Sequence, residues 1–152
     1  MRTLLILLAL LPAVLSLEAL TIRTAHTRYY PEREIRPILQ YFGKSLAGQR
    51  FRTVVATRPD DPQGQYFIAR LGETREGSPV TARMTLYTSA SKDPRVHNWS
   101  LSGERLDNWL YLGITGEDWA GEAIQPLAWK IELLDSAGTV LADWKSFLWE
   151  MP

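Results

Sequence analysis

Apolar and charged residues alternate most regularly between Leu127 and Trp149, near the end of the chain. The pattern predicts two strands joined by a loop from Asp135 to Gly138, in which the glycine supplies the positive φ of a tight turn. Apolar residues then pair on a single face: Leu133 with Val140, Ile131 with Ala142, and Trp129 with Trp144. On the other face Lys130 lies opposite Asp143. Because a slip of one residue would exchange the two faces, we expect a strongly specified register.

Shorter period-two patterns recur along the rest of the chain, and turn residues bound each of them. They predict further strands at Leu20–His26, Arg50–Thr57, Gln65–Leu71, Pro79–Thr88, Arg95–Leu101 and Asn108–Ile114. The strand that contains Tyr66 and Phe67 is apolar on both faces, which favours a central position. About eight short strands are typical of an all-β, single β-sandwich of immunoglobulin- or fibronectin-type-III-like kind. A small β-barrel is the alternative.

Residues 32–48 have a helical rather than a strand-like periodicity. Their apolar residues fall three and four positions apart and share one helical face: Ile35, Ile38, Leu39, Phe42 and Leu46. Pro37 has no amide donor and would clash inside a helix, so we predict one short helix near 37–46 that starts close to Pro37. It should stop at Gly43 or continue irregularly to Gly48. We expect this helix to close one end of the sheet pair.

The first residues have the pattern of a secretory signal. Arg2 precedes an apolar run, Leu4 to Leu15, which is shorter than the about 20 residues that span a bilayer. We therefore predict that residues 1–19 are a cleaved signal peptide, cut after residue 16 or 19, and that residues 20–152 form a single domain. The expected location is periplasmic or secreted, without stable membrane insertion after cleavage.

The cysteine content and the charge balance narrow the possible functions. The chain of 152 residues contains no cysteine, so packing must hold the fold without disulfides. The formal net charge is zero, although basic residues dominate between Thr21 and Arg58 and acidic residues dominate afterwards. We interpret the two halves as neighbouring surfaces that neutralise each other. An exported protein of this kind is not expected to bind nucleic acid.

Few side chains could carry out catalysis. His26 and His97 are the two histidines, and two distant histidines make a poor zinc site. We predict no catalytic residue, no metal site and no cofactor. One acidic cluster lies in a glycine-containing loop and comprises Glu117, Asp118 and Glu122. It leaves a small glycoside-type hydrolase as an alternative, because such enzymes use paired carboxylates.

The same loop carries Trp119, whereas Trp99, Trp109, Trp129 and Trp144 occupy inward-compatible positions on predicted strands. An exposed Trp119 could stack on a sugar ring while the neighbouring acids bind its hydroxyl groups, which would make a carbohydrate-binding module. It could equally anchor a partner protein, as tryptophan often does. We slightly favour a third interpretation, in which Trp119 caps the open end of the sandwich.

Beyond the hairpin, the segment Phe147 to Trp149 falls opposite Pro126, which cannot donate to a strand ladder. We expect it to pair near Leu20 or to stay an open strand edge, and such an edge suits strand addition to a partner or to a second copy. We therefore predict an exported, non-catalytic protein-interaction or assembly module of the bacterial envelope, with a protein or a glycan as partner. The residues expected to bind are Glu117, Asp118, Trp119, Glu122, Phe147 and Trp149.

Overall fold

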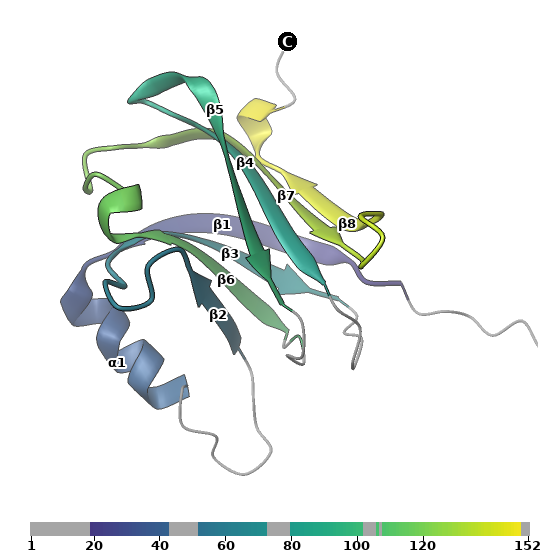
Figure 1. Cartoon of the computed structure of the whole chain (residues 1–152), viewed down its shortest axis with the longest axis horizontal. Coiled ribbons are helices and arrows are strands. Elements are labelled where there is room, and N and C mark those ends of the chain that lie inside the picture. The colour runs from purple at the N-terminus through teal and green to yellow at the C-terminus, as the bar shows by residue number, and fades with distance from the viewer. Residues whose placement is uncertain (1–18, 43–51, 73–79, 102–105, 107, 150–152) are drawn as a thin grey trace, which may run out of the picture.

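The computed structural model describes residues 19–42, 52–72, 80–101, 106 and 108–149 (Figure 1). The elements in chain order are β1 (Ile22–Tyr30), α1 (Glu32–Phe42), β2 (Arg52–Ala56), β3 (Gly64–Leu71), β4 (Thr81–Thr88), β5 (Ser91–Ser100), β6 (Trp109–Thr115), η1 (Gly116–Asp118), β7 (Pro126–Leu134), β8 (Val140–Lys145) and η2 (Phe147–Trp149). The turns η1 and η2 are short 3-10 helices. Residues 1–18 of the predicted signal peptide lie outside the described residues, and no described helix is long and apolar enough to cross a membrane.

The strands form two four-stranded sheets. Sheet 1 has the order β1-β3-β6-β2, and sheet 2 has the order β5-β4-β7-β8. Neighbouring strands are antiparallel except β2 and β6, which run parallel. Within the described part of the chain the sheets do not close into a barrel, so the barrel alternative finds no support. The mostly-β architecture with one short helix is confirmed, and the immunoglobulin- or fibronectin-type-III-like assignment stays a prediction.

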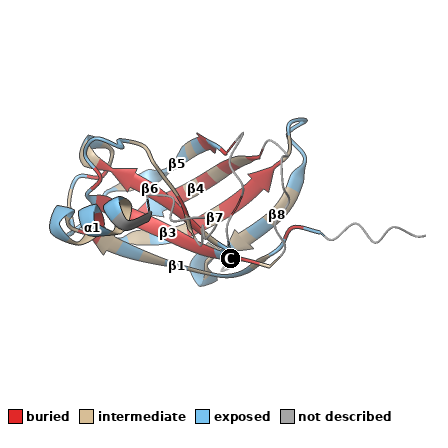
Figure 2. Ribbon diagram, turned by 90° about the horizontal axis from the view of Figure 1, so that it is seen from below, coloured by how far each residue is buried: buried red, intermediate tan, exposed pale blue. Residues whose placement is uncertain are grey.

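The main hydrophobic core lies between the two sheets (Figure 2). Alternate residues of the four central strands point into it: Phe67, Ala69, Leu71, Ala82, Met84, Leu86, Leu110, Leu112, Ile114, Trp129, Ile131 and Leu133. The rings of Phe67 and Trp129 meet edge to face across this interface, with centroids 5.3 Å apart. One side of the sandwich is closed by contacts between β1 and β8, and β2 and β5 are the outer strands on the opposite side.

Helix α1 covers the outer face of sheet 1 (Figure 1). The side chain of Ile35 is fully buried there and packs in a second cluster with Tyr30, Tyr66, Ile68 and Tyr111. Strand β3 is therefore covered on both faces and lies between β1 and β6, which confirms the central position that its apolar sequence predicts.

The helix begins at Glu32, so the predicted start near Pro37 is wrong. The main-chain carbonyl of Pro31 accepts the first hydrogen bonds from the N–H groups of Glu34 and Ile35, which starts the helix one turn earlier. Pro37 removes one amide donor inside the helix but lies on its exposed side. The helix also lies on the face of sheet 1 and not at the end of the sheet pair, because the apolar stripe packs on the outward-facing tyrosines. Residues 43–48 lie outside the described residues.

The β7–β8 hairpin keeps its predicted faces except at Val140, which pairs with Leu134 and is 46% exposed, but it does not keep its predicted register. Ile131 pairs with Trp144 instead of Ala142. The cause is the turn, because the N–H of Asp135 donates to the carbonyl of Thr139 at 3.0 Å and so brings Asp135 into the ladder. A bulge next to Leu133 adds the remaining shift. Gly138 has the expected positive φ, at 82°.

The predicted charge pair of the hairpin is wrong for the same reason. Glu132 lies opposite Asp143, and Lys130 lies opposite Lys145. Glu132 instead accepts Arg83 Nε at 2.9 Å and Lys130 Nζ at 3.0 Å. Burial raises the pKa of Glu132, but the two cations outweigh burial and hold the pKa below its ordinary value.

Candidate functional site

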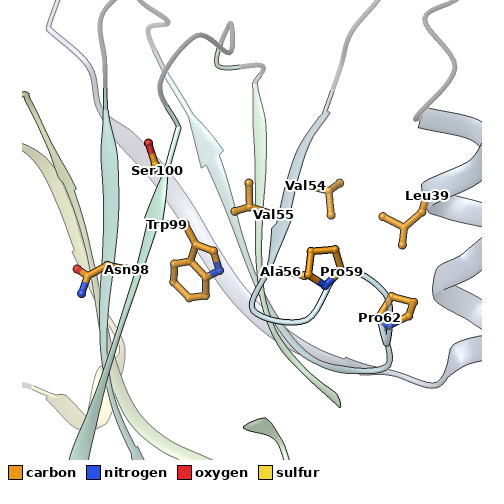
Figure 3. A pocket seen from close by; sticks show the side chains of 9 residues that line it. All are labelled: Leu39, Val54, Val55, Ala56, Pro59, Pro62, Asn98, Trp99 and Ser100. Carbon is orange, nitrogen blue, oxygen red and sulfur yellow. The ribbon is translucent and has the colours of Figure 1, made fainter. Parts of the chain in front are cut away.

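The side of the sandwich between β2 and β5 is hollowed into a groove of about 440 Å³ (Figure 3). This volume is typical of ligand-binding clefts. The lining residues come from α1, β2, the β2–β3 loop and β5: Leu39, Val54, Val55, Ala56, Pro59, Pro62, Asn98, Trp99 and Ser100. None of them is charged, so a charged group placed in the groove would lose its hydration without gaining a counter-ion. The groove therefore suits an uncharged, largely apolar occupant.

The second half of strand β2, Val54 to Ala56, is apolar on both faces although the strand lies at the edge of sheet 1. Val55 packs against the core between the sheets, and Val54 packs with Leu39 on the helix side. Both valines and Ala56 are half-buried. Strands that are apolar on both faces are normally internal to a sheet. In the described chain, Val54 to Ala56 thus have the sequence of an internal strand, but β2 has a neighbour on one side only.

The main-chain groups of Val54 and Ala56 point away from sheet 1. Thr57 donates its N–H to the carbonyl of Gly113 at 2.9 Å, which fixes the hydrogen-bonding phase of the parallel β2–β6 pair. The main-chain groups of alternate residues point to the neighbouring strand. Those of Val55 therefore bond to β6, and those of Val54 and Ala56 point to the groove side. Because β2 is the last strand of sheet 1 in the described residues, no strand pairs with these groups and the edge of β2 can accept another strand.

Strand β5 presents a second open edge on the same side. Leu101 donates its N–H to the carbonyl of Val80 at 2.7 Å. In an antiparallel pair this phase directs the main-chain groups of Val96 and Asn98 away from β4. The first half of the strand carries residues that protect sheet edges from pairing, namely Lys92, Asp93, Pro94 and Arg95. Only the half of β5 next to the groove is therefore open to pairing.

Trp99 forms the inner wall of the groove. Its side chain is 7% exposed, and its Nε1–H has no hydrogen-bond partner in the described structure. Figure 3 shows the indole nitrogen on the side of the ring that faces β2 and Val55. A buried donor without a partner costs about 1–3 kcal/mol.

His97 lies beside Trp99 on the inner face of β5. The two rings stack with centroids 6.0 Å apart, and His97 Nε2 also has no partner among the described residues. Burial lowers the pKa of His97, an effect that nearby Asp118 opposes and that Arg95 reinforces. The imidazole beside the groove is therefore neutral at physiological pH.

A second hollow of about 460 Å³ adjoins the groove at the β2–β3 loop. Here the guanidinium of Arg58 contacts the carboxylates of both Glu117 and Asp118, the latter at 3.1 Å. The Thr57 hydroxyl and Arg58 lower the pKa of Asp118, although burial opposes them. A general acid needs a raised pKa, so Asp118 is unsuited to that role as it lies here. Glu122 is exposed and takes no part in the ion pairs of Arg58 with Glu117 and Asp118.

Trp119 is 4% exposed and belongs to the core between the sheets. The premise of an exposed tryptophan on which a sugar could stack is therefore wrong, and the interpretation of Trp119 as a cap on the open end of the sandwich stays a prediction. The core neighbours of Trp119 come from distant strands, and the N–H of Trp119 donates to the carbonyl of Gly116 at 3.1 Å, which closes the turn η1.

The C-terminal segment is not a strand, so the expectation of an overhanging strand edge is wrong. Phe147 to Trp149 form η2, in which Trp149 donates its N–H to the carbonyl of Ser146 at 3.0 Å. The turn folds over sheet 2, where the Trp149 ring lies 5.8 Å from that of Tyr87 and 5.6 Å from Lys130 Nζ. Phe147 is 81% exposed. Partner binding through Phe147 or Trp149 stays a prediction.

The groove itself was missed by reasoning from sequence. Its signal was the run Val54-Val55-Ala56 in a strand that turned out to be an edge strand. The parallel pairing of β2 with β6, which brings this edge toward β5, leaves no local mark in the sequence. The predicted site residues lie elsewhere: Glu117 and Asp118 adjoin the second hollow, and Trp119 lies in the core.

Neither metal chemistry nor similarity to known proteins assigns a role to this site. The described residues contain no group of three or more His, Asp or Glu side chains placed to hold a metal ion. The chain matches no family model, no curated protein and no solved structure in the comparisons. Its function has to be inferred from the geometry of the groove.

Proposed function

We propose that the protein is a non-catalytic protein-interaction module that captures an extended segment of a partner polypeptide in the groove between β2 and β5. The observation that carries the proposal is the pair of open strand edges, at Val54 and Ala56 and at Val96 and Asn98, which border one uncharged groove. Strand addition supplies main-chain hydrogen bonds for affinity, and the groove supplies contacts for side chains. With its predicted signal peptide, the module would act in the periplasm or outside the cell.

The two alternatives predicted from sequence have less support. A carbohydrate-binding module lacks an accessible ring at Trp119, which is buried. A hydrolase would use Glu117, Asp118 or Glu122, and the first two are ion-paired with Arg58. An immunoglobulin- or fibronectin-type-III-like sandwich remains our proposal for the fold, because such domains often bind through their edges.

Peptide selection tests the proposal directly. A phage-displayed library of random dodecapeptides would be panned on the protein, and the tightest peptide would be synthesised for titration calorimetry. A variant with both edges blocked, Ala56→Pro with Asn98→Pro, removes the two amide donors that face the groove side. We expect it to bind this peptide at least about tenfold more weakly, since each lost main-chain hydrogen bond contributes to affinity.

Asp143→Pro is the matched control on another edge. Ser146 donates its N–H to Trp129 at 2.9 Å, so Asp143, three residues earlier in β8, directs its own amide away from β7. This control should bind the peptide like the unmodified protein, and near-UV circular dichroism would verify that all variants fold. Failure to select any peptide, or equal binding by the double variant, would contradict the proposal. Loss of binding only in Asp143→Pro would point to β8 instead.

A further inference from the structure

The outer face of sheet 1 carries an unbalanced positive charge. Helix α1 packs over one end of this face, on Tyr30 and Tyr66 (Figure 2). None of the four strands contains an Asp or a Glu, whereas together they contain four arginines: Arg23, Arg28, Arg52 and Arg70. Arg28 is paired with Glu34 of the helix at 3.0 Å. The other three arginines lie toward the opposite end of the strands.

These three arginines form one row across the sheet. Arg70 pairs with Trp109, and Trp109 pairs with Arg52, so the two arginines flank the tryptophan with their Cα atoms about 10 Å apart. Arg23 extends the row from the bulge in β1, and its side chain lies over Gly72, where a Cβ would be 2.8 Å from Arg23 Nε. Alternate residues of these strands point into the core, so the row lies on the outer face. We call Arg23, Arg70, Trp109 and Arg52 the arginine row.

Aromatic rings hold two of the guanidinium groups in place. Arg70 Cζ lies 5.8 Å from the centroid of the Trp109 ring, and Arg52 Cζ lies 5.7 Å from that of Tyr111. A guanidinium that stacks on a ring through its face keeps the N–H groups of its edge for another partner. Arg23 and Arg70 form no ion pair with any described residue. Because the edge of a guanidinium matches the two oxygens of a carboxylate, the row is suited to bind carboxylates.

The surroundings of the row favour a polypeptide as the source of these carboxylates. A flat bilayer surface would meet α1 first, because a helix packed on a sheet stands about 10 Å above it. Trp109 packs on the cluster below α1 and carries Arg70 on its ring, so a sugar could stack there only by displacing that arginine. An extended chain can lie beside the helix, and three of its residues span about the same 10 Å that separates Arg70 from Arg52.

We propose that the arginine row is a second binding surface, separate from the groove, and that it binds an acidic segment of a partner protein. Carboxylates about three residues apart in the segment bind the guanidinium edges of Arg70 and Arg52, and an apolar side chain between them contacts Trp109. A single exposed ion pair contributes little, so affinity depends on several carboxylates and falls as salt is added. The row and the groove share no residue, so either can bind without the other.

A synthetic acidic peptide tests the row directly. The probe is a fluorescein-labelled peptide of four Glu-Leu-Ser repeats, titrated by fluorescence polarisation at low salt, and a Gln-Leu-Ser peptide is the uncharged comparison, which should not bind. Arg23→Gln with Arg70→Gln should weaken binding of the glutamate peptide about tenfold. Lys92→Gln with Arg95→Gln removes the same charge from exposed positions on β5 and should change the affinity by less than about twofold. Equal weakening in the two double variants would reduce the effect to net charge and overturn the proposal.

NMR spectroscopy of the unmodified protein gives an answer that does not depend on the folding of a variant. The indole N–H resonance of Trp109 should shift when the glutamate peptide is added, whereas that of Trp129, in the core between the sheets, should not. An unshifted Trp109 resonance would refute binding at the row. Vesicles of phosphatidylglycerol and, separately, heparin test other anions. Binding of either that requires Arg23 and Arg70, without binding of the peptide, would overturn the assignment to a polypeptide.

Discussion

The imidazole of His97 stacks on the indole of Trp99 with an angle of 26° between the ring planes. Burial lowers the pKa of His97, so the folded protein binds this proton less well than the unfolded chain does. Protons therefore favour the unfolded chain. This contribution to the free energy of unfolding is absent above the ordinary histidine pKa of about 6.5, and stability is lost as the pH falls from there toward the lowered pKa. We expect the free energy of unfolding to decrease as the pH falls below about 6.5.

Two matched variants assign this effect to one histidine. Urea unfolding would be measured at several pH values between about 5 and 8, where histidine titrates. His97→Gln should make the free energy of unfolding less dependent on pH. His26→Gln, at an exposed position on β1, should leave this pH dependence unchanged. The pKa of Asp118, which interacts with His97, is held below its ordinary value by the Thr57 hydroxyl and Arg58, so Asp118 does not account for the change. An identical slope in His97→Gln and the unmodified protein would contradict the assignment.

The hydroxyl of Thr115 holds the β2–β3 loop against the end of β6. It accepts the N–H of Arg58 at 2.9 Å and donates to the carbonyl of Arg58 at 3.0 Å, and Thr115 is fully buried. Thr115→Val keeps the shape but leaves these groups unpaired, so it should lower the free energy of unfolding by about 1–3 kcal/mol. Thr85→Val, on the outer face of sheet 2, is the control, and we expect it to change stability by less than about 0.5 kcal/mol. Similar losses in the two variants would show that the hydroxyl has no such role.

The ion pair between Glu132 and Arg83 should contribute more to the free energy of unfolding than an exposed ion pair does. The Glu132 side chain is 11% exposed, and Arg83→Met would leave it with Lys130 alone. We expect a loss of about 1–3 kcal/mol in the free energy of unfolding. Arg36→Met breaks the exposed pair with Glu32 on α1 and should cost no more than about 0.5 kcal/mol. Chemical denaturation of the two variants compares them, and an equal cost would mean that burial of Glu132 is unimportant.

The turn η2 contains a packed tryptophan, Trp149, and an exposed phenylalanine, Phe147. Trp149→Ala removes the contacts with Tyr87 and Lys130 and should lower the free energy of unfolding by about 1–2 kcal/mol. Phe147→Ala should change it by less than about 0.5 kcal/mol, because Phe147 is largely exposed. If Phe147→Ala instead abolishes binding of a partner while leaving stability unchanged, the predicted role of this residue in recognition gains support.

The faces of strands could be read from the sequence, but their register could not. Alternation placed Ile131 and Trp144 on the core side, and that is where they lie. It could not reveal that Asp135 joins the ladder or that a bulge follows, because the two together shift the register by two residues and leave Ile131, Ala142 and Trp144 facing inward. A register shift of two residues exchanges partners without exchanging faces, and therefore leaves the hydrophobic pattern unchanged.

Local rules were also overruled by tertiary packing. The rule that proline starts a helix placed the beginning of α1 at Pro37, but burial of Ile35 on sheet 1 extends the helix to Glu32. The loop around Trp119 looked exposed because it is short of apolar neighbours in sequence, yet its core neighbours come from distant strands. The groove depends on the pairing of β2 with β6, and no nearby residue specifies that pairing.

The same pairing sets an order of assembly for the two walls of the groove. Strand β5 follows its partner β4 after a tight turn, so this wall can form as a local hairpin. Strand β2 has to wait for β6, which the chain supplies only after β3, β4 and β5 have been made. Closing so long a loop is entropically costly and slow. A newly synthesised chain therefore carries β2 without its partner strand until β6 has been made, and this wall of the groove forms last.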